Sequence, residues 1–524
     1  MRGLKVVLIE RNDLAFGASG NSSGLIHGGP RYLTSDPNVT YTSCLDSGYI
    51  QRIAPHLLFR IPVIVPVTKQ PGSRLELDLL DAFFGAYDRF QPLKRGKPHT
   101  RLSGDELRRL EPGLVGEFEG GVTFDEWGID GARLCVANAL DAERHGARVW
   151  VPVTVTRFLR EANGRVSGVG YQDRVDGRSG ELRARWVVNA TGAWAPLTTS
   201  LGGVRTREAR VRPGKGIHDY FDRRLSNYGI MVKAIDGRRV FIEPWQTMSV
   251  LGTTDDDFYG DLDEVRATTD EVRYLFEAIG RVFPAIHQAR ALGTWAGVRP
   301  TLYEWGKHED ALSREHTIVD HTAEGMPGLF SMVGGKLASY RLFAQEMSDR
   351  LTTLLGAEVA CSTHLRPLPG GEEVPAADDI AATARIDALS AARLVYRHGA
   401  RARQLAERMA QNPQERELVC SCEPVTCAEV RHAVEAEWAF DVEGVARRTR
   451  LGLGSCGGLR CAGRCGALVA EARGESAAHG RRMACEFLGR QAERRASVVG
   501  PAGVRHEMLL RQHWVHQFGF GGTR

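Results

Sequence analysis

Apolar and polar positions divide the start of the chain into a strand and a glycine-rich loop. Residues 6–9 form a continuous apolar run, which is the pattern of a buried parallel strand. Glu10 ends the run, where a carboxylate can accept hydrogen bonds from both hydroxyls of a ribose. Five glycines follow within residues 17–29 and let the backbone approach a ligand closely. The hydroxyls beside them that could bind a phosphate are those of Ser19, Ser22 and Ser23.

This pattern predicts the second half of a dinucleotide-binding βαβ unit, and a plain surface loop is the alternative. The glycine turn of such a unit, G-x-G-x-x-G, lies about 20 residues before the acid. Only nine residues precede Glu10, so this turn and the first strand are not in the sequence. Two interpretations stay open: the start codon was assigned too late, or the chain lacks half of its pyrophosphate site.

Caps and periodicity predict the next elements. Ser103 and Glu106 form a capping box before a short helix, and Asp130 begins a helix within residues 128–145. The strands predicted next are 148–157, 165–171 and 182–189. This order of a helix and three strands recurs in flavin-binding folds, where a small sheet lies beside the main parallel sheet.

A second, mostly antiparallel layer is predicted for residues 205–295. Segments 241–243 and 248–252 have the pattern of a hairpin that covers a substrate. Thr268 and Glu271 form a capping box at the start of a helix that we expect to continue to residue 283. Residues 48–118 mix short apolar strands with helical stretches and are expected to join the same layer.

Two apolar strands end in glycine. Residues 187–189 continue into Ala190, Thr191 and Gly192, where glycine lets the chain pass close to a dinucleotide. The second strand meets Gly334 and Gly335, and we expect a helix from Lys336, whose N-terminus would attract an anion. The alternative for Lys336 is an ordinary surface residue at a helix start.

Cations and one imidazole lie near these strands. Lys215 and His218 are three residues apart, which we interpret as a cation and a base placed together, although a lone histidine is often structural. Arg299 precedes Pro300, which holds it in an extended conformation, so its guanidinium could be fixed toward a ligand.

Composition limits the class of protein. The 524 residues suffice for two to four domains, and 43% hydrophobic with 25% charged residues is ordinary for a globular protein. A net charge of +4 is small for this length and argues against a nucleic-acid surface. We find neither an apolar run of about 18 residues, as a membrane span needs, nor the layout of a signal peptide.

Cysteines are concentrated in one part of the chain, since six of the ten lie within residues 420–465. Their pattern includes C-x-C, 33 intervening residues and C-x4-C, and four thiolates can bind zinc or a [2Fe–2S] cluster. Zinc ribbons favour paired C-x-x-C, so iron–sulfur is the preferred interpretation. The predicted ligands are Cys420, Cys422, Cys456 and Cys461, with Cys427 and Cys465 left over.

These motifs together resemble a known family. The segments ERNDLAFGASGNSSGLIHGGPRYL, VVNATGAWA, GVRP, SREH and GGKLASYR, in this order, resemble FAD-dependent glycerol-3-phosphate dehydrogenases over residues 1 to about 365. The cysteine pattern resembles a BFD-like [2Fe–2S] domain, as found in the A subunit of the anaerobic enzymes. The chain departs from the family at Pro30, where leucine or alanine is expected, and in the missing glycine turn.

The resemblance implies an α/β fold. An FAD-binding Rossmann-like domain of the D-amino-acid oxidase and glutathione reductase type, residues 1–365, would carry an antiparallel substrate domain formed by about 48–118 and 205–295. A linker and helical segment would occupy 366–415. A small helical BFD-like domain would occupy 416–475, and a tail 476–524.

The resemblance also assigns site residues. The FAD contacts would be Glu10, Ser19, Ser22, Ser23, Gly192, Gly334 and Gly335. The substrate phosphate and oxygens would bind Arg31, Tyr32, Arg299, Arg314 and Lys336. The catalytic groups would be His218, Arg299 and Lys336. His218 is the candidate base; it matches a Lys-Gly-Ser-His pattern of the aerobic relatives with Ile217 in place of Ser, and the iron–sulfur relatives need not have it.

The implied reaction is oxidation of sn-glycerol 3-phosphate to dihydroxyacetone phosphate, with a base taking the hydroxyl proton and FAD taking hydride. Electrons would pass through the [2Fe–2S] cluster toward quinone by way of a partner subunit. The expected location is the cytoplasm, at the inner membrane surface through that partner. Two alternatives stay open: another flavin amine or hydroxy-acid oxidoreductase of this fold, and a truncated, non-catalytic electron-transfer subunit.

Overall fold

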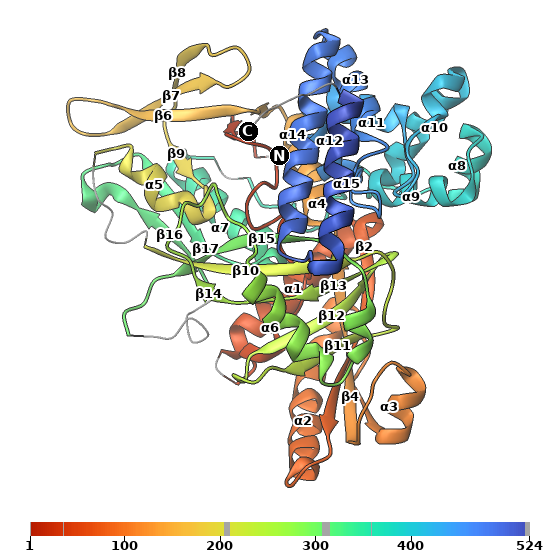
Figure 1. Cartoon of the computed structure of the whole chain (residues 1–524). Coiled ribbons are helices and arrows are strands. Elements are labelled where there is room, and N and C mark those ends of the chain that lie inside the picture. The colour runs from red at the N-terminus through yellow and green to blue at the C-terminus, as the bar shows by residue number, and fades with distance from the viewer. Residues whose placement is uncertain (1, 35, 204–209, 307–314, 358, 519–524) are drawn as a thin grey trace.

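The computed structural model describes residues 2–34, 36–203, 210–306, 315–357 and 359–518 (Figure 1). Its parallel strands lie in two small sheets. β1 (Val7–Ile9) pairs with β5 (Arg148–Trp150), while β9 (Val187–Asn189) pairs with β17 (Leu329–Gly334). β16 (His316–Asp320) adds to β17 in the antiparallel sense. The carboxyl ends of such strands are where α/β folds bind ligands.

A nine-stranded sheet forms the second layer, and only its β2–β11 pair is parallel among the described strands. In spatial order the strands are β15 (Ala291–Leu302), β10 (Val211–Phe221), β13 (Met248–Gly252) with the short β14 (Asp256–Asp257), β12 (Arg239–Trp245), β11 (Gly229–Lys233), β2 (Leu58–Thr68), β4 (Phe118–Ile129) and β3 (Thr100–Ser103). The hairpin predicted for residues 241–252 is confirmed as β12 and β13.

Alternation along these strands gives the sheet two different faces. Ile217 of β10 and Ile242 of β12 point to one face, where they share a hydrophobic core with Leu275 of α6 (Thr269–Gly280). His218 and Glu243 follow them directly in sequence and therefore point to the opposite face. That opposite face borders the cavity described below.

Helices and a small sheet surround these layers. α1 and α4 share a core that contains Ile50, Ile53 and Leu134, and α2 and α3 lie at the far end of β4 (Figure 1). The helices are α1 (Pro37–Ile53), α2 (Ser73–Tyr87), α3 (Gly104–Leu110), α4 (Gly131–Arg144), α5 (Ala195–Ser200) and α7 (Tyr340–Leu354). The three-stranded antiparallel sheet consists of β6 (Val153–Arg160), β7 (Val166–Asp173) and β8 (Ser179–Arg183).

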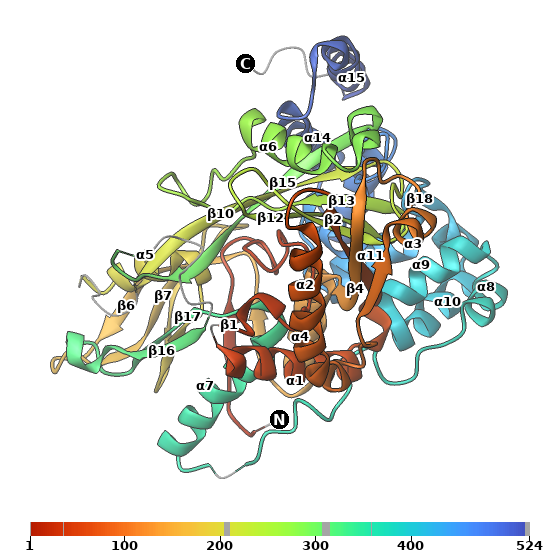
Figure 2. The same cartoon turned by 90° about the horizontal axis from the view of Figure 1, so that it is seen from below.

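The C-terminal third is helical and packs on the first domain. Its elements are α8 (Ala377–Ala384), α9 (Ala388–His398), α10 (Ala402–Gln411), β18 (Leu418–Cys420), β19 (Val425–Thr426), α11 (Cys427–Ala436), α12 (Val442–Thr449), α13 (Ala462–Ala472), α14 (Ala477–Ala496) and α15 (Pro501–Phe518). In Figure 2, α15 projects from the body of the molecule. Within the described residues, no helix has the length and apolarity needed to cross a membrane.

Features that depend only on residues close together in the sequence were predicted correctly. The capping boxes predicted at Ser103 and Thr268 are present, and Asp130 caps α4. The single strand predicted for 148–157 is wrong, because the chain changes sheets at Pro152, which has no N–H to continue the ladder. The single strand predicted for 182–189 is wrong in the same way, since β8 and β9 belong to different sheets.

Candidate functional site

A cavity of about 3170 Å³ lies between the parallel strands and the nine-stranded sheet. Its walls come from segments that are far apart in the sequence: the loop after β1, the ends of β9 and β17, and the face of the sheet that carries His218. The predicted site residues that line it are Glu10, Ser19, Ser22, Ser23, Tyr32, Gly192, His218, Arg299, Gly334, Gly335 and Lys336. The structure therefore brings together both predicted groups, for cofactor and for substrate.

The loop after β1 is held in a defined conformation. The Asn21 side-chain amide donates to the carbonyl oxygens of Phe16 and Gly17, at 2.7 and 3.0 Å. Gly297 of β15 lets the sheet approach this loop, since a Cβ there would lie 2.7 Å from the Asn21 carbonyl oxygen. Glu10 accepts a hydrogen bond from the Asn12 N–H at 2.7 Å, and burial raises the pKa of its carboxyl. The acid thus lies at the cavity wall as a hydrogen-bond acceptor.

The C-terminal domain also holds this loop. Asp13 is buried and accepts two hydrogen bonds from the Arg448 guanidinium of α12, at 2.8 and 2.9 Å. Arg447 lies over the Phe16 ring, with its guanidinium carbon 5.2 Å from the ring centroid. The position of the glycine-rich loop therefore depends on the packing between the two domains.

The second glycine pair has the sharp turn that the sequence suggests. Gly334 has φ +84°, and a Cβ there would lie 2.3 Å from the Glu315 carbonyl oxygen, so only glycine fits. A helix begins at Lys336 as predicted, but its first turn is the 3-10 helix η8 (Leu337–Ser339), for which Lys336 is the N-cap, and α7 follows at Tyr340. The Lys336 ammonium lies 3.7 Å from the centroid of the Tyr32 ring, which supplies a cation–π contact.

His218 is the most unusual group at the cavity. Its side chain is 2% exposed, and neither ring nitrogen has a hydrogen-bond partner among the described residues. Its ring stacks on Trp295 with 5.5 Å between centroids. Burial, and then the charge of Arg299, lower the pKa of His218 to about 3. The imidazole is therefore neutral at physiological pH.

Arg299 lies on the same face of the sheet as His218, close enough for its charge to lower the pKa of that histidine. It points over Gly216 of the neighbouring strand, where a Cβ would lie 2.4 Å from the guanidinium. The guanidinium donates to Asp255 and to Thr253 Oγ1, each at 3.0 Å, and remains part of the cavity wall. The arrangement offers a fixed positive charge next to a neutral base.

The pairing of Lys215 with His218 is wrong. The two residues are three apart on a strand, so their side chains point to opposite faces. The Lys215 ammonium forms an ion pair with Glu271 of α6 at 2.7 Å, on the side away from the cavity. In a strand, only residues an even number of positions apart share a face. Arg299, and not Lys215, is therefore the cation on the face of the sheet that carries His218.

Two predicted substrate ligands cannot be placed. Arg314 lies outside the described residues, and Arg31 belongs by its backbone to the short helix η1 (Pro30–Tyr32) beside the cavity. One residue was missed. Glu243 lines the cavity on β12, is 2% exposed, and burial raises the pKa of its carboxyl well above the ordinary value. Its sequence signal was a lone acid in the apolar strand Val240–Trp245.

The predicted cysteine ligands converge although 33 residues separate the two pairs. Cys422 Sγ lies 3.8 Å from Cys456 Sγ, and Cys461 shares hydrogen bonds with both Cys420 and Cys456. These contacts with Cys461 lower the pKa of Cys420 to about 7 and that of Cys456 to about 5. A lowered pKa favours the thiolate, which is the form that binds metal.

The two remaining cysteines of this region have other contacts. Cys465 belongs to the hydrophobic core of the domain, and burial raises the pKa of its thiol. Cys427 accepts a hydrogen bond from Arg464 at 3.4 Å at the start of α11. Among the described residues, neither of these two cysteines hydrogen-bonds to another sulfur, whereas the predicted ligands contact one another.

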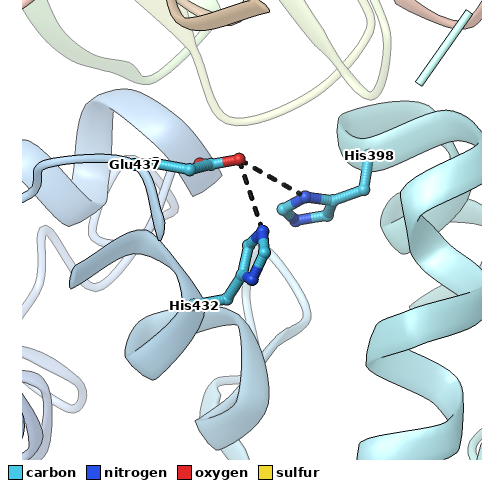
Figure 3. Close-up of side chains that lie close together, drawn as sticks. All are labelled: His398, His432 and Glu437. Carbon is cyan, nitrogen blue, oxygen red and sulfur yellow. Dashed lines mark ion pairs between the residues drawn. The ribbon is translucent and has the colours of Figure 1, made fainter. Parts of the chain in front are cut away.

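A further cluster joins α9, α11 and the turn after α11 (Figure 3). The ligand atoms of His398, His432 and Glu437 all lie within 4.8 Å of one another. However, Arg133 and Arg401 already donate to the Glu437 carboxylate, at 2.6 and 2.7 Å. Two guanidinium ions at the same carboxylate repel a metal cation, so the cluster is a buried ion-pair network that fastens α4 of the first domain to the C-terminal domain.

Glu437→Gln is expected to destabilise the protein by about 3–5 kcal/mol, because it leaves two buried guanidinium ions without their counter-charge. The midpoint of urea or thermal unfolding measures this. Glu435→Gln is the matched control: Glu435 pairs with Arg408 at the surface, where such pairs contribute about 0–1 kcal/mol. Equal effects of the two variants would contradict this assignment.

Comparison with known proteins defines the family. A protein-family model described as FAD dependent oxidoreductase matches residues 1–341, and another, described as the C-terminal domain of alpha-glycerophosphate oxidase, matches residues 361–479. The chain belongs to the FAD-dependent oxidoreductase family. The second match covers residues 366–415, which we expected to be a linker with helices, and residues 416–475, which we expected to be a cluster domain.

Similar members of this family have names that concern one substrate. The A1 subunit of anaerobic glycerol-3-phosphate dehydrogenase from Haloferax volcanii is 33% identical over 479 residues, which covers 88% of this chain and 78% of that protein. The corresponding subunit of the anaerobic enzyme from Escherichia coli K12 is 30% identical over 523 residues, which covers 99% of this chain and 92% of that protein.

Solved structures of family members share the fold. Glycerol-3-phosphate dehydrogenase from Bacillus halodurans, complexed with FAD, has a TM-score of 0.75 at 22% identity, over 95% of this chain and 92% of that one. L-alpha-glycerophosphate oxidase from Mycoplasma pneumoniae, with FAD bound, has a TM-score of 0.50 at 20% identity, over 70% of this chain and 93% of that one. The predicted fold class, with its FAD-binding domain and helical C-terminal domain, is confirmed.

Proposed function

We propose that the protein oxidises sn-glycerol 3-phosphate to dihydroxyacetone phosphate with FAD as cofactor. The observation that carries this is the cavity wall on which Arg299 and the neutral His218 lie together. Family membership and the names of relatives that match nearly the whole chain support the substrate and the cofactor. When bound, FAD supplies the acceptor for the hydride of the substrate's C2.

The chain's own residues would bind FAD at the carboxyl ends of the parallel strands. Glu10 presents a carboxylate for the ribose, and the serines of residues 19–23 present hydroxyls for phosphate. Gly192 and the Gly334–Gly335 turn let backbone approach the ligand without a side chain between them. These residues fit FAD in type and place, since all of them face one cavity.

The substrate's phosphate carries two negative charges and needs several cations. Arg299 and Lys336 both line the cavity, and an arginine offers two parallel hydrogen bonds to phosphate oxygens. Tyr32, whose ring lies against Lys336, would donate to a substrate oxygen, and Arg31 and Arg314 are proposed as further phosphate ligands. His218 would take the hydroxyl proton as the hydride leaves C2.

We also propose a [2Fe–2S] cluster at Cys420, Cys422, Cys456 and Cys461. The four thiols converge, and two of them have pKa values low enough to bind as thiolates. A single zinc ion needs four sulfurs about 2.3 Å from one centre. The spacing of the four cysteines does not follow the paired C-x-x-C of zinc ribbons, which favours the iron–sulfur cluster over zinc.

A partner subunit in a complex with this chain would pass its electrons to quinone. A cluster beside a flavin site passes electrons singly out of the protein, and the names of the similar proteins, which are those of single subunits, support a multi-subunit enzyme. By the same analogy with these subunits, the partner would anchor the enzyme at the cytoplasmic surface of the inner membrane.

An absorbance spectrum of anaerobically purified protein, before and after addition of glycerol 3-phosphate, tests the proposed function. Flavin bands that bleach with this substrate, and not with glycine or proline, support it. Bleaching by amino acids instead would favour a different oxidoreductase of the same fold. Iron–sulfur absorbance without flavin would favour an electron-transfer subunit.

Cys422→Ser is expected to remove the cluster's absorbance and its EPR signal while flavin bleaching by substrate persists. The reason is that one of four ligands is lost, at a position away from the FAD cavity. Cys485→Ser in α14 serves as the control and should keep the cluster. An unchanged cluster signal in Cys422→Ser would remove Cys422 from the ligand set.

A further inference from the structure

A line of packed side chains connects the cavity to the cysteine site. It begins at His218, which stacks on Trp295. Trp295 contacts Trp245 with 5.8 Å between ring centroids, and Arg450 of the C-terminal domain lies over the Trp245 ring at 4.4 Å. Both strands that carry the tryptophans, β15 and β12, belong to the nine-stranded sheet, so the line crosses from one domain into the other.

Glu423 connects Arg450 to the cysteine site. Its guanidinium lies 3.4 Å from the Glu423 carboxylate, and the Glu423 N–H donates to Cys420 Sγ at 3.5 Å. The N–H of Gly452, two residues after Arg450, also donates to Cys420. Hydrogen bonds to a cluster's sulfurs and nearby charges are among the factors that set its reduction potential.

The charge of Arg450 is unusual for a buried residue. Its side chain is 4% exposed, and its Nε and one terminal nitrogen have no hydrogen-bond partner among the described residues. Arg393 lies close enough to add to the positive field. A buried cation is costly unless a negative charge compensates for it. Glu423 supplies one such charge at 3.4 Å, and a thiolate-bound cluster, which becomes more negative by one charge on reduction, would supply more.

We propose that Trp295, Trp245 and Arg450 form the electron path from the flavin to Cys420, and that the Arg450 charge favours reduction of the cluster. This inference rests on the proposed function. Oxidation of the alcohol gives two electrons to the flavin as hydride and a proton to His218. A cluster held by the four cysteines would accept the flavin's two electrons one at a time and pass each to a quinone-linked acceptor. The tryptophans act as packed medium for tunnelling and are not themselves oxidised.

The first test measures the cluster's potential by an EPR-monitored redox titration. In Arg450→Gln the reduced form should be disfavoured at least about tenfold, a shift of about 59 mV to lower potential for one electron. Arg450→Lys keeps the charge and should restore most of the potential. The control is Arg473→Gln, which lies about 18 Å along α13 from Cys461 and pairs with Glu475. An unchanged potential in Arg450→Gln overturns the role of its charge.

The second test separates the two electron-transfer steps in stopped-flow experiments. Trp245→Leu should leave the rate of flavin bleaching unchanged, whereas Trp295→Leu also removes the ring on which His218 stacks and is judged only by the step after bleaching. In both variants the appearance of reduced cluster after bleaching should be slower by about tenfold. The corresponding phenylalanine variants keep the packed ring and should be close to wild type. Trp127→Leu, which changes a third tryptophan of the same sheet outside the line, is the control. Unchanged cluster reduction in both leucine variants overturns the path.

Different results would contradict the proposed function and the proposed electron path. If the wild-type protein shows no cluster signal, or no flavin bleaching with glycerol 3-phosphate, the proposed function is contradicted. The electron path is then contradicted as well, because it rests on that function. A wild-type protein that shows both signals, with variants that behave like it, contradicts only the path. If the leucine variants do not fold, the potential of Arg450→Gln still decides the role of Arg450.

Discussion

Replacing Arg299 by alanine is expected to lower kcat/KM for glycerol 3-phosphate about a hundredfold, which corresponds to about 3 kcal/mol of lost charge-assisted hydrogen bonding. The guanidinium is held by Asp255 and Thr253, so its direction is fixed before the substrate arrives. Preorganised groups bind without a further cost in side-chain entropy. Most of the loss should therefore appear in KM, measured by steady-state kinetics.

Two comparisons make the Arg299 result specific. Arg299→Lys keeps the charge but not the paired donors, so its kcat/KM should lie between those of the wild type and the alanine variant. Arg101→Ala removes an arginine that pairs with Asp78 at the surface, on the far strand β3, and should change little. A KM for Arg299→Ala equal to that of the wild type would show that the phosphate binds elsewhere in the cavity.

His218→Gln is expected to slow substrate-dependent flavin bleaching about 10²- to 10⁴-fold, the usual contribution of a general base. The imidazole is the neutral base nearest Arg299, and its ring nitrogens are available for the hydroxyl proton. Single-turnover stopped-flow absorbance measures this step without product release. His145→Gln, at the exposed end of α4, is the control. Bleaching within threefold of the wild-type rate would exclude His218 as the base.

The pH dependence gives a second, independent check on His218. A base works when it is unprotonated, and its activity falls as pH decreases through its pKa. Burial and Arg299 lower that pKa to about 3, so bleaching at saturating substrate should show no acid limb near 6.5, the ordinary value for histidine. A limb near 6.5 that is present in the wild type and absent in His218→Gln would contradict the lowered pKa.

Several parts of the fold were predictable because their causes are local. A capping box needs only Thr268 and Glu271 at the right spacing, and the hairpin β12–β13 needs only two short apolar strands. The turn at Gly334 and Gly335 follows from backbone freedom that glycine alone has. Element boundaries were less predictable. The chain changes sheets at Pro152, and no local pattern indicates which sheet the residues before it (β5) and after it (β6) would join.

The sequence by itself determined the types of group at the site: an acid after a strand, glycine turns, a histidine, an arginine and four cysteines. Only the tertiary structure decided their neighbours. Strand pairing placed Arg299 rather than Lys215 beside His218, and burial set the low pKa of that histidine. Folding across 33 residues brought the cysteine pairs together, and domain packing set Arg450 over Trp245. Contact, burial and electric field depend on distance in space, which spacing along a chain does not specify.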